Sequence, residues 1–334
     1  MMTTPRIRIG IAGVAHGHAH SYAAAGKELA GVVVSGVYDH DASRGAAFAA
    51  HYGVPWYPEL SDVLASCDTL MIAAENTQHH PIAMQAAAAK VPTLCEKPLA
   101  TTLTDAQAMV DTFAQAGVAL GTAFPVRYSP AVVRLRNTLN GGALGQTLMV
   151  RATNRGTYPG GWFGDPVWSG GGALMDHIVH VADLVRWIWG REIVSVYAEG
   201  ATRLHDIPVD DVGMLLMTLD DGMVVSLDPS WSRPAGVYPT WGDVTMEVTT
   251  VHGIVNLDVF GPHVDVYQQS TRRYQWAGHG VNFDAAMIAD WIDAVRNGTA
   301  APISGVDGLR AVAVVDAAYR SMHSHRPEAV HPLR

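Results

Sequence analysis

The strongest constraint on the fold is an alternation of short apolar runs with helix-like segments through residues 6–123. Strand-like runs occupy residues 6–14, 32–39, 69–74, 92–95 and 118–123, with a further short run at 55–57. Helix-like stretches lie between them at residues 19–29, 42–51, 81–90 and 103–116. Because strands that alternate with helices and lack hairpin signals pair in parallel, this half predicts an α/β fold with a doubly wound parallel sheet and helices on both faces.

The pattern changes after Phe124. Helices are expected at residues 127–139, 172–189, 283–297 and 305–324. Strand candidates lie at residues 147–156, 193–202, 213–219, 223–231, 243–250, 254–259 and 263–268. Turns such as Asp220-Asp221-Gly222 suit antiparallel neighbours. We therefore predict two domains: an α/β domain at residues 1–124, and an α+β domain at residues 125–334 with a largely antiparallel, open sheet.

Composition excludes several classes of protein. The 334 residues are 49% hydrophobic and 16% charged, which is ample for two packed cores. The formal net charge of −9 disfavours a nucleic-acid partner, since backbone binding needs clustered Lys and Arg. The apolar runs are far shorter than the ~20 residues of a membrane-spanning helix, and the amino terminus lacks the apolar core of a signal peptide. A cytoplasmic protein without a membrane partner is expected.

The chain contains two cysteines, Cys67 and Cys95. Their positions, one just before a predicted strand and one within the next, favour buried free thiols over a disulfide framework. A catalytic thiol needs an accessible, electropositive setting, so this role is disfavoured, although Cys95 lies close to Lys97.

The turn after the first strand has the character of a dinucleotide-binding loop. Such a loop needs close backbone approach to a pyrophosphate and a helix amino terminus facing it. Aligned from Gly13, the next two fingerprint positions hold Ala15 and His18, with Gly17 one position early. We expect cofactor contacts from Gly13, Ala15, His16, Gly17 and His18.

Asp39 supports this interpretation. It ends the second predicted strand, 21 positions after His18, and the spacing agrees with the expected ~20 residues. A carboxylate there accepts hydrogen bonds from both hydroxyls of the adenosine ribose and repels a 2′-phosphate, so residues 1–124 are predicted to be a Rossmann domain that prefers NAD. Arg44 leaves NADP possible, because a guanidinium could accept the phosphate. The alternative is that Asp39 only starts a turn.

Candidate catalytic groups come from two places. Glu96-Lys97-Pro98 follows the fourth predicted strand, at the edge where ligands bind in open parallel sheets, and a lysine there can hold or protonate a substrate oxygen. Asp176 and His180 are four residues apart in a predicted helix and share one face. Each could be structural instead, as a solvated turn or a helix-surface pair.

The order of these motifs resembles the Gfo/Idh/MocA family of nicotinamide-dependent sugar and polyol oxidoreductases. Asn76-Thr77-Gln78-His79 resembles the family's Pro-Asn-x-x-His turn, and residues 170–176 with His180 and Asp183 resemble its Gly-Gly-Gly-x-Leu-x-Asp-x-x-x-His-x-x-Asp helix. Segments 127–130 and 304–310 also look like family signatures. The resemblance runs from about Arg6 to about Ala329. It implies a substrate pocket between the domains, and cofactor contacts from Asn76, His79, Glu96 and Lys97.

The predicted substrate residues combine aromatic and hydrogen-bonding side chains, which suit a pyranose or polyol. They are Arg127, Asn154, Arg155, Tyr158, Trp162, Asp176, His177 and Tyr238, with Trp231 and Arg233 as further candidates. Trp162 and Trp231 could equally be packing residues, and Arg155 could pair with a surface carboxylate.

Two groups of side chains suggest metal ligands. His16, His18 and His20 alternate, but a helix that begins near His18 would separate them. Asp176, His177 and His180 form a second conceivable set. Hydride chemistry assisted by a lysine needs no metal, and the family resemblance implies none, so we predict no metal.

The function predicted from these residues is an NAD-dependent dehydrogenase acting on a secondary alcohol of a cyclic sugar, polyol or inositol-like substrate. His180 is the expected general base, Lys97 the group that polarises the reacting oxygen, and Asp176 the residue that orients the substrate. Asp183 either fixes the tautomer of His180 or pairs with Arg186.

Two other functions stay open: a redox-neutral, NAD-dependent glycoside hydrolase or lyase, and a nucleotide-binding sensor without catalysis. The intact set of Lys97, Asp176 and His180 argues against the sensor. The open sheet of the second domain would leave apolar residues in water, so a homodimer or homotetramer is also predicted.

Overall fold

The computed structural model describes residues 6–270, 272–278 and 280–332. Residues 1–5, where a signal peptide was considered, lie outside this description. The chain forms two compact units. The first comprises Met1–Pro125, Val167–Gly170 and Asp284–Val312, and the second comprises Val126–Pro166, Gly171–Phe283 and Ala313–Arg334. The single division of the sequence after residue 124 remains a prediction about where the folding domains end.

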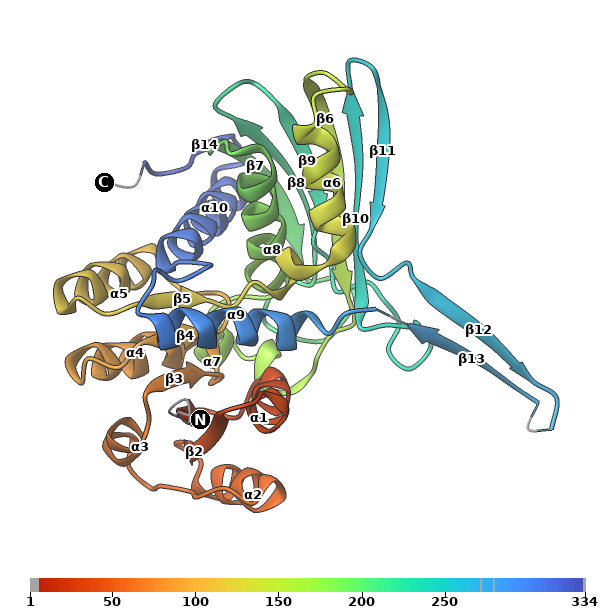
Figure 1. The fold of residues 1–334 in the computed structure, drawn as a ribbon. Coiled ribbons are helices and arrows are strands. Elements are labelled where there is room, and N and C mark those ends of the chain that lie inside the picture. The colour runs from red at the N-terminus through yellow and green to blue at the C-terminus, as the bar shows by residue number, and fades with distance from the viewer. Residues whose placement is uncertain (1–5, 271, 279, 333–334) are drawn as a thin grey trace. The chain divides into compact units, whose positions relative to one another are not determined.

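The first unit is built on a parallel sheet of five strands (Figure 1). They are β1 (Ile7–Ala12), β2 (Val32–Tyr38), β3 (Thr69–Ile72), β4 (Thr93–Cys95) and β5 (Leu120–Thr122), in the order β2-β1-β3-β4-β5. Every neighbouring pair is parallel. The predicted doubly wound sheet is therefore confirmed. The prediction of a short strand at residues 55–57 was wrong: Trp56 forms only an isolated bridge to Val37.

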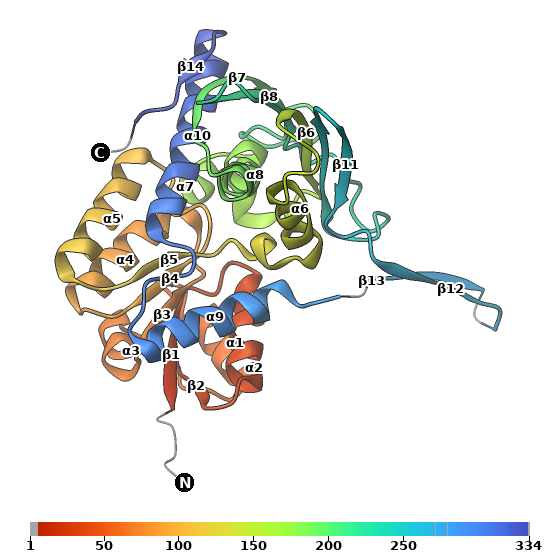
Figure 2. The same cartoon turned by 45° about the horizontal axis from the view of Figure 1, so that its top comes forward.

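Helices cover both faces of this sheet. Figures 1 and 2 show α3, α4 and α5 on one face, with α1 and α9 on the other. The helices are α1 (His18–Glu28), α2 (Ala42–Tyr52), α3 (Leu60–Ser66), α4 (His79–Ala88), α5 (Leu103–Ala116) and α9 (Phe283–Asn297), with short turns η1 (Asn76–Gln78) and α7 (Pro166–Ser169). Trp291 of α9 donates a hydrogen bond to Thr69 Oγ1 (3.0 Å), and its ring lies so close to Gly121 that a Cβ there would approach it to 2.8 Å. Through these contacts α9 packs on the amino-terminal sheet, although the helix is distant from these strands in sequence.

The second unit contains a seven-stranded sheet in the order β11-β10-β6-β9-β8-β7-β14. The strands are β6 (Thr147–Gly156), β7 (Ile193–Ala201), β8 (Val212–Leu219), β9 (Val224–Asp228), β10 (Gly242–Thr250), β11 (Gly253–Asp258) and β14 (Glu328–Ala329). β6 and β9 are parallel, whereas the other neighbours are antiparallel. The prediction of a largely antiparallel sheet is confirmed. A separate hairpin, β12 (His263–Gln268) and β13 (Arg273–Gly278), extends away from this sheet (Figures 1 and 2).

One face of the seven-stranded sheet is covered by helix α8 (Ala173–Trp189), most of which is buried. Its amino terminus depends on Asp210, whose carboxylate accepts hydrogen bonds from the backbone of Gly172 (3.2 Å) and Leu174 (2.8 Å). A Cβ at Gly172 would overlap the carbonyl oxygen of Asp210, so this position requires glycine. Helix α6 (Pro130–Asn140) begins later than predicted because residues 125–128 form the short turn η2 (Pro125–Tyr128) and Pro130 occupies the first helical turn. The long helix α10 (Gly305–Ser324) runs through both units.

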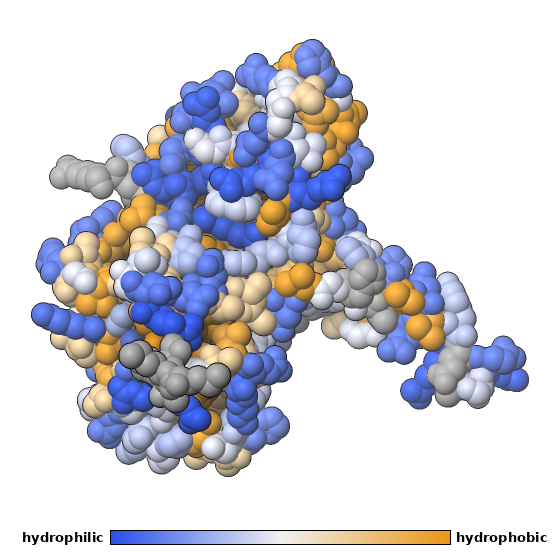
Figure 3. Space-filling model, in the orientation of Figure 1, coloured by the Kyte–Doolittle hydropathy of each residue, from blue (hydrophilic) through white to orange (hydrophobic). Residues whose placement is uncertain are grey.

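The opposite face of the seven-stranded sheet exposes apolar side chains. Met149, Met214, Leu216 and Ile254 all lie on it, as the pairing of the strands requires, and all are exposed. Figure 3 shows apolar surface near the β10–β11 edge and along the β12–β13 hairpin. Among the described residues, no helix has both the length and the apolar character needed to cross a bilayer.

Candidate active site

The loop after β1 has the backbone geometry that a dinucleotide needs. Gly13 has φ = +77°, and a Cβ there would overlap both the backbone and the side chain of Ala74. Its N–H donates to the carbonyl of Tyr38 (2.8 Å), which fixes the loop against β2. The loop leads directly to the amino terminus of α1, where Gly17 occupies the N-cap. A close backbone turn facing a helix amino terminus fits a pyrophosphate group.

Asp39 lies at the end of β2 and is buried. Its carboxylate accepts hydrogen bonds from the backbone N–H groups of Val14 (2.7 Å) and Asp41 (2.8 Å). Arg44 donates to both of its oxygens, through Nε (3.0 Å) and Nη2 (2.8 Å). Burial opposes the charge of Arg44, but the hydrogen bond and the charge of Asp39 outweigh burial and raise the pKa of Arg44. The ribose acceptor predicted from the sequence is therefore held in place by an arginine.

Arg44 also pairs with Glu75, whose Oε1 lies 2.8 Å from Nη2. Glu75 was missed by sequence reasoning, although an acidic residue directly after the apolar run of β3 was a usable signal. Beside this cluster is a pocket of about 70 Å³ at the carboxyl ends of β1, β2 and β3. It is lined by Gly13, Tyr38, His40, Leu60, Ala74, Gln78, Pro81, Ile82 and Gln85. The pocket and the cluster lie at the strand ends where open α/β sheets bind the adenosine half of a dinucleotide.

Glu96 is directed toward helix α1 and is fully buried. The hydroxyl of Tyr22 donates to Glu96 Oε1, His18 Nδ1 lies 3.0 Å from the same oxygen, and the backbone N–H of Lys97 donates to Oε2 (3.2 Å). Burial opposes protonation of His18, but the charge of Glu96, its hydrogen bond and the charge of Asp284 together raise the pKa of His18. The side chain that replaces the third fingerprint glycine thus anchors the segment that carries Lys97.

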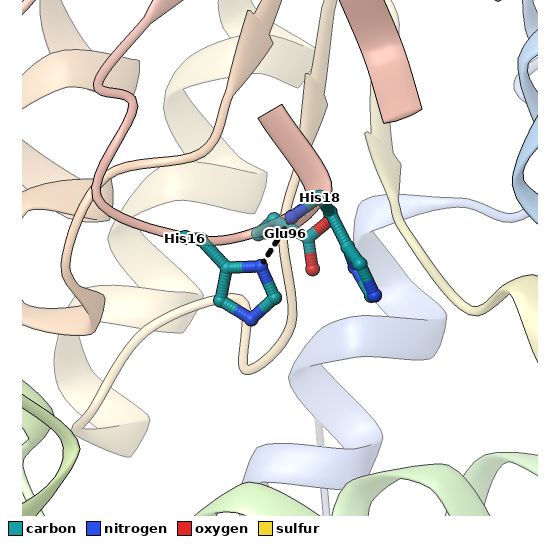
Figure 4. Close-up of side chains that lie close together, drawn as sticks. All are labelled: His16, His18 and Glu96. Carbon is teal, nitrogen blue, oxygen red and sulfur yellow. Dashed lines mark hydrogen bonds and ion pairs between the residues drawn. The ribbon is translucent and has the colours of Figure 1, made fainter. Parts of the chain in front are cut away.

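His16, His18 and Glu96 lie close together (Figure 4). They offer possible metal-ligand atoms within 4.8 Å of one another. However, Glu96 Oε1 already bonds to Tyr22 and His18, and His16 Nδ1 accepts the backbone N–H of His18 (3.2 Å). His20, the third of the alternating histidines, lies against Tyr52 instead (3.0 Å). The three-histidine site is therefore not formed, and the absence of a metal stays a prediction.

Asn76 and His79 bind backbone groups. Asn76 Nδ2 donates to the carbonyl of Ser169 (2.9 Å). His79 is fully buried, with Nδ1 2.8 Å from the carbonyl oxygen of Pro98 and Nε2 3.2 Å from that of Ala74. Burial lowers the pKa of His79 to about 4, although the contacts with the carbonyls of Pro98 and Ala74 oppose this shift. This location favours a positioning role for His79, linking the end of β3 to the turn after Lys97, over direct cofactor contact.

In the second unit, Asp176 and His180 lie on the same face of α8 and are both nearly buried. Trp231 Nε1 donates to Asp176 Oδ2 (3.2 Å), and His177 Nε2 lies 3.2 Å from the same oxygen. His177 Nδ1 is 2.9 Å from the carbonyl oxygen of Pro229, which can only accept, so this nitrogen carries a hydrogen. Trp231 thus orients the carboxylate of Asp176, and the ring of His177 lies against the same oxygen.

Three other predicted substrate residues, Asn154, Tyr158 and Trp162, also belong to the second unit. Asn154 is fully buried on β6, and neither its Nδ2 nor its Oδ1 has a hydrogen-bond partner among the described residues. The ring of Tyr158 lies 5.2 Å from that of Trp231. Trp162 stacks on Phe163 at 3.9 Å. A buried amide without a protein partner is costly, so Asn154 is a candidate ligand-binding group.

Arg155 and Tyr238 belong to a different cluster. Arg155 follows Asn154 on the strand and therefore lies on the opposite face of the sheet. Asp243 accepts hydrogen bonds from Arg155 Nε (3.2 Å), Arg233 Nε (2.7 Å) and the hydroxyl of Tyr238 (3.3 Å). Burial alone would raise the pKa of Asp243, but hydrogen bonds from Thr153, Arg233 and Arg155 and the charge of Arg155 lower it. The structure does not group Arg155 and Tyr238 with Asp176.

Arg127 and Asp183 form a buried ion pair that the sequence did not suggest. Arg127 Nε donates to Asp183 Oδ2 (2.7 Å), and Nη2 donates to Oδ1. Arg186, one of the two partners weighed for Asp183, donates to Glu192 through Nε at 2.8 Å. Both roles considered for Asp183 stay predictions, and we infer that Arg127 is held as part of the protein framework. Lys97 belongs to the first unit, whereas Asp176 and His180 belong to the second.

The fold and the nucleotide loop define a class: an oxidoreductase with an NAD-binding Rossmann domain. Residues 7–124 match the family model described as "Oxidoreductase family, NAD-binding Rossmann fold", and residues 132–256 match the "GFO/IDH/MocA C-terminal domain". The two matches together cover most of the chain. The protein belongs to the Gfo/Idh/MocA oxidoreductase family, which confirms the resemblance found in its motifs.

Individual relatives are similar over nearly their whole length. The chain is 26% identical to a D-apiose dehydrogenase from Rhizobium rhizogenes, covering 90% of this chain and 91% of the relative. It is 27% identical to inositol 2-dehydrogenase 2 from Paenarthrobacter aurescens, covering 95% and 96%. Among solved structures, GenD2 from gentamicin A biosynthesis, in complex with NAD, matches with a TM-score of 0.90 and 26% identity, covering 99% of this chain and 98% of that chain.

Both thiols are buried and neither is in a disulfide, as predicted. Burial raises the pKa of Cys67 to about 11 and also raises the pKa of Cys95. Because the thiolate is the reactive form, neither cysteine is suited to nucleophilic catalysis at neutral pH.

Proposed function

We propose that the protein is an NAD-dependent dehydrogenase that oxidises a secondary alcohol of a cyclic sugar, polyol or inositol-like molecule. The carrying observation is the buried carboxylate of Asp176, which accepts a hydrogen bond from Trp231, together with the buried amide of Asn154, which has no partner among the described residues. A carboxylate and an amide fixed among aromatic rings suit a ligand with hydroxyl groups and an apolar ring face. The names of the D-apiose and inositol relatives support the same substrate class.

NAD, when bound, supplies the hydride acceptor, so the side chains have to manage the substrate oxygen and its proton. We assign His180 as the general base that takes the hydroxyl proton. Lys97 donates a hydrogen bond to the same oxygen and stabilises its negative charge. Asp176 accepts a hydrogen bond from the substrate and holds the hydroxyl in reach of the base.

Lys97 is positioned by its neighbours on the chain. The carboxylate of Glu96 accepts the backbone N–H of Lys97, and His79 binds the carbonyl of Pro98, so the residues on both sides of Lys97 are fixed. Proton transfer and charge stabilisation depend on placement within tenths of an ångström, and a fixed backbone reduces the freedom of the lysine. The segment 96–98 therefore suits a catalytic lysine better than a solvated turn.

The test uses Lys97→Met and His180→Ala, with substrates screened among sugars, inositols and anhydrosugars by the absorbance of reduced cofactor. Each variant should keep its fold and its NAD affinity but lose turnover by about 10²–10⁴-fold, the usual contribution of an acid–base group. Lys90→Met and His323→Ala are matched controls, because both side chains are exposed. Both controls should retain the rate of the wild type.

A double variant tests whether the two groups act on one hydroxyl. If they do, the combined loss should be much smaller than the product of the single losses, since neither group is effective without the other. Rates within a few-fold of the wild type in the single variants, with NAD still bound, would contradict the assignment. Substrate cleavage without net formation of reduced cofactor would instead identify the redox-neutral hydrolase or lyase.

We also propose a homodimer or homotetramer in the cytoplasm. The support is the apolar outer face of the seven-stranded sheet, with Met149, Leu216 and Ile254 exposed on it. The β12–β13 hairpin adds exposed Val266 and Tyr267, and a two-stranded hairpin is only marginally stable by itself. Sedimentation as a monomer at micromolar concentration would contradict the oligomer, and Leu216→Glu should weaken assembly if this face is the interface.

A further inference from the structure

Glu75 is a buried acid at the edge of the adenosine pocket. It is 3% exposed, directly follows Ala74 of the pocket lining, and places Oε1 2.8 Å from Arg44 Nη2. Its other oxygen, Oε2, is buried and has no hydrogen-bond partner among the described residues, with His40 Nδ1 at 3.7 Å. A buried carboxylate oxygen without a donor is unfavourable, which indicates that a ligand supplies one.

Arg44 is held by two carboxylates at once. Its Nε and Nη2 donate to the two oxygens of Asp39, and Nη2 also lies 2.8 Å from Glu75. Two full negative charges thus surround one positive charge, and the cluster as a whole is negative. Because Arg44 binds both oxygens of Asp39 and one oxygen of Glu75, its N–H groups point at protein oxygens.

This cluster borders the place where the two nicotinamide dinucleotides differ. Asp39 lies between Tyr38 and His40, which both line the adenosine pocket. NADP differs from NAD by a phosphate on the 2′ oxygen of the adenosine ribose, and a protein accepts that phosphate with a nearby arginine. Arg44 is the arginine beside Asp39. The preference between NAD and NADP therefore depends on whether its guanidinium can turn to a 2′-phosphate.

We propose that Glu75 determines cofactor selectivity by holding Arg44 on Asp39, so that the guanidinium cannot accept a 2′-phosphate. Its second oxygen serves as an acceptor for a ribose hydroxyl, and the net negative charge of the cluster repels NADP. The inference rests on the proposed use of NAD. In this proposal, two carboxylates at the ends of different strands, Asp39 and Glu75, together discriminate NAD from NADP.

The experiment compares dissociation constants for NAD and NADP, measured by titration calorimetry, in the wild type and in Glu75→Gln. Removal of this charge releases one side of Arg44, so the ratio of NADP affinity to NAD affinity should rise by about tenfold or more. In the double variant Arg44→Met/Glu75→Gln the gain should disappear. Glu59→Gln is the matched control: it removes an exposed carboxylate whose charge acts on Tyr38, and it should leave the ratio unchanged.

Three results would overturn the inference: an unchanged NAD/NADP ratio in Glu75→Gln, a gain that persists in the double variant, or an equal gain in Glu59→Gln. Glu75→Ala removes the same carboxylate without leaving a buried amide and must shift the ratio in the same direction, which covers a failure of the Gln variant to fold. If the wild type bound neither dinucleotide, the proposed function would fail together with the inference. NAD binding with an unshifted ratio would overturn the inference alone.

Discussion

The buried ion pair between Arg127 and Asp183 gives a quantitative test of the second unit. Asp183 is fully buried and Arg127 is nearly so, and two hydrogen bonds join them. The change Asp183→Asn removes the negative charge at almost constant volume and leaves the guanidinium in a site of low dielectric. The free energy of unfolding should fall as a result.

The magnitude follows from the burial of both groups. Removal of one partner from a buried pair typically destabilises a protein by about 3–5 kcal/mol, because the remaining charge is uncompensated. Replacement of both partners by apolar groups, as in Arg127→Met/Asp183→Leu, leaves no buried charge, so the double variant should be more stable than Asp183→Asn. Glu192→Gln is the control: it breaks the similar pair with Arg186, but the Glu192 side chain is 42% exposed, and the expected loss is at most about 1 kcal/mol.

Unfolding in urea, followed by circular dichroism, measures these differences. A loss below about 1 kcal/mol in Asp183→Asn, equal to that of the control, would refute the reasoning. Arg127 would then be free to act as the substrate-binding residue that its sequence position suggested. A large loss accompanied by unchanged affinity for substrate would confirm that Arg127 supports the framework.

Three further predictions concern the loop, the histidine beside it and the start of α8. Gly13→Ala should weaken NAD binding by at least about tenfold in calorimetry, because φ is +77° and the new Cβ would overlap Ala74; normal affinity would contradict the loop assignment. The raised pKa of His18 means that its ion pair with a buried acid stabilises the fold fully below its ordinary pKa of about 6.5, and that this stability is lost as pH rises through the folded value. The stability difference between the wild type and His18→Gln in urea should therefore be larger near about pH 6 than near about pH 9, and a difference that grows with pH would exclude this pairing. Gly172→Ala should lower the free energy of unfolding by about 3 kcal/mol, because its Cβ would overlap the carbonyl oxygen of Asp210; near-native stability would show that this turn can relax.

The sequence by itself predicted the parallel sheet, the antiparallel sheet and most helices, because these features follow from local periodicity. The observed bounds of α5, α9 and α10 are the predicted ones. The apolar spacing and the residues that begin and end a helix are local signals, so they can be found in the sequence of that helix alone. Spacing also predicts Gly13 and Asp39 as cofactor-binding residues, because a strand, a tight turn and a helix fix where such residues have to stand.

Tertiary structure decided which side chains meet. Trp231 bonds to Asp176 across 55 positions, and Arg127 bonds to Asp183 across 56. The ion pair between Arg44 and Glu75 likewise joins the start of α2 to the segment after β3. No periodicity within a segment encodes these pairs, because they depend on the register of neighbouring strands and on how helices pack on a sheet. The sequence therefore determined the elements and the residues of the loop, whereas packing alone decided that Arg44 is held by two acids.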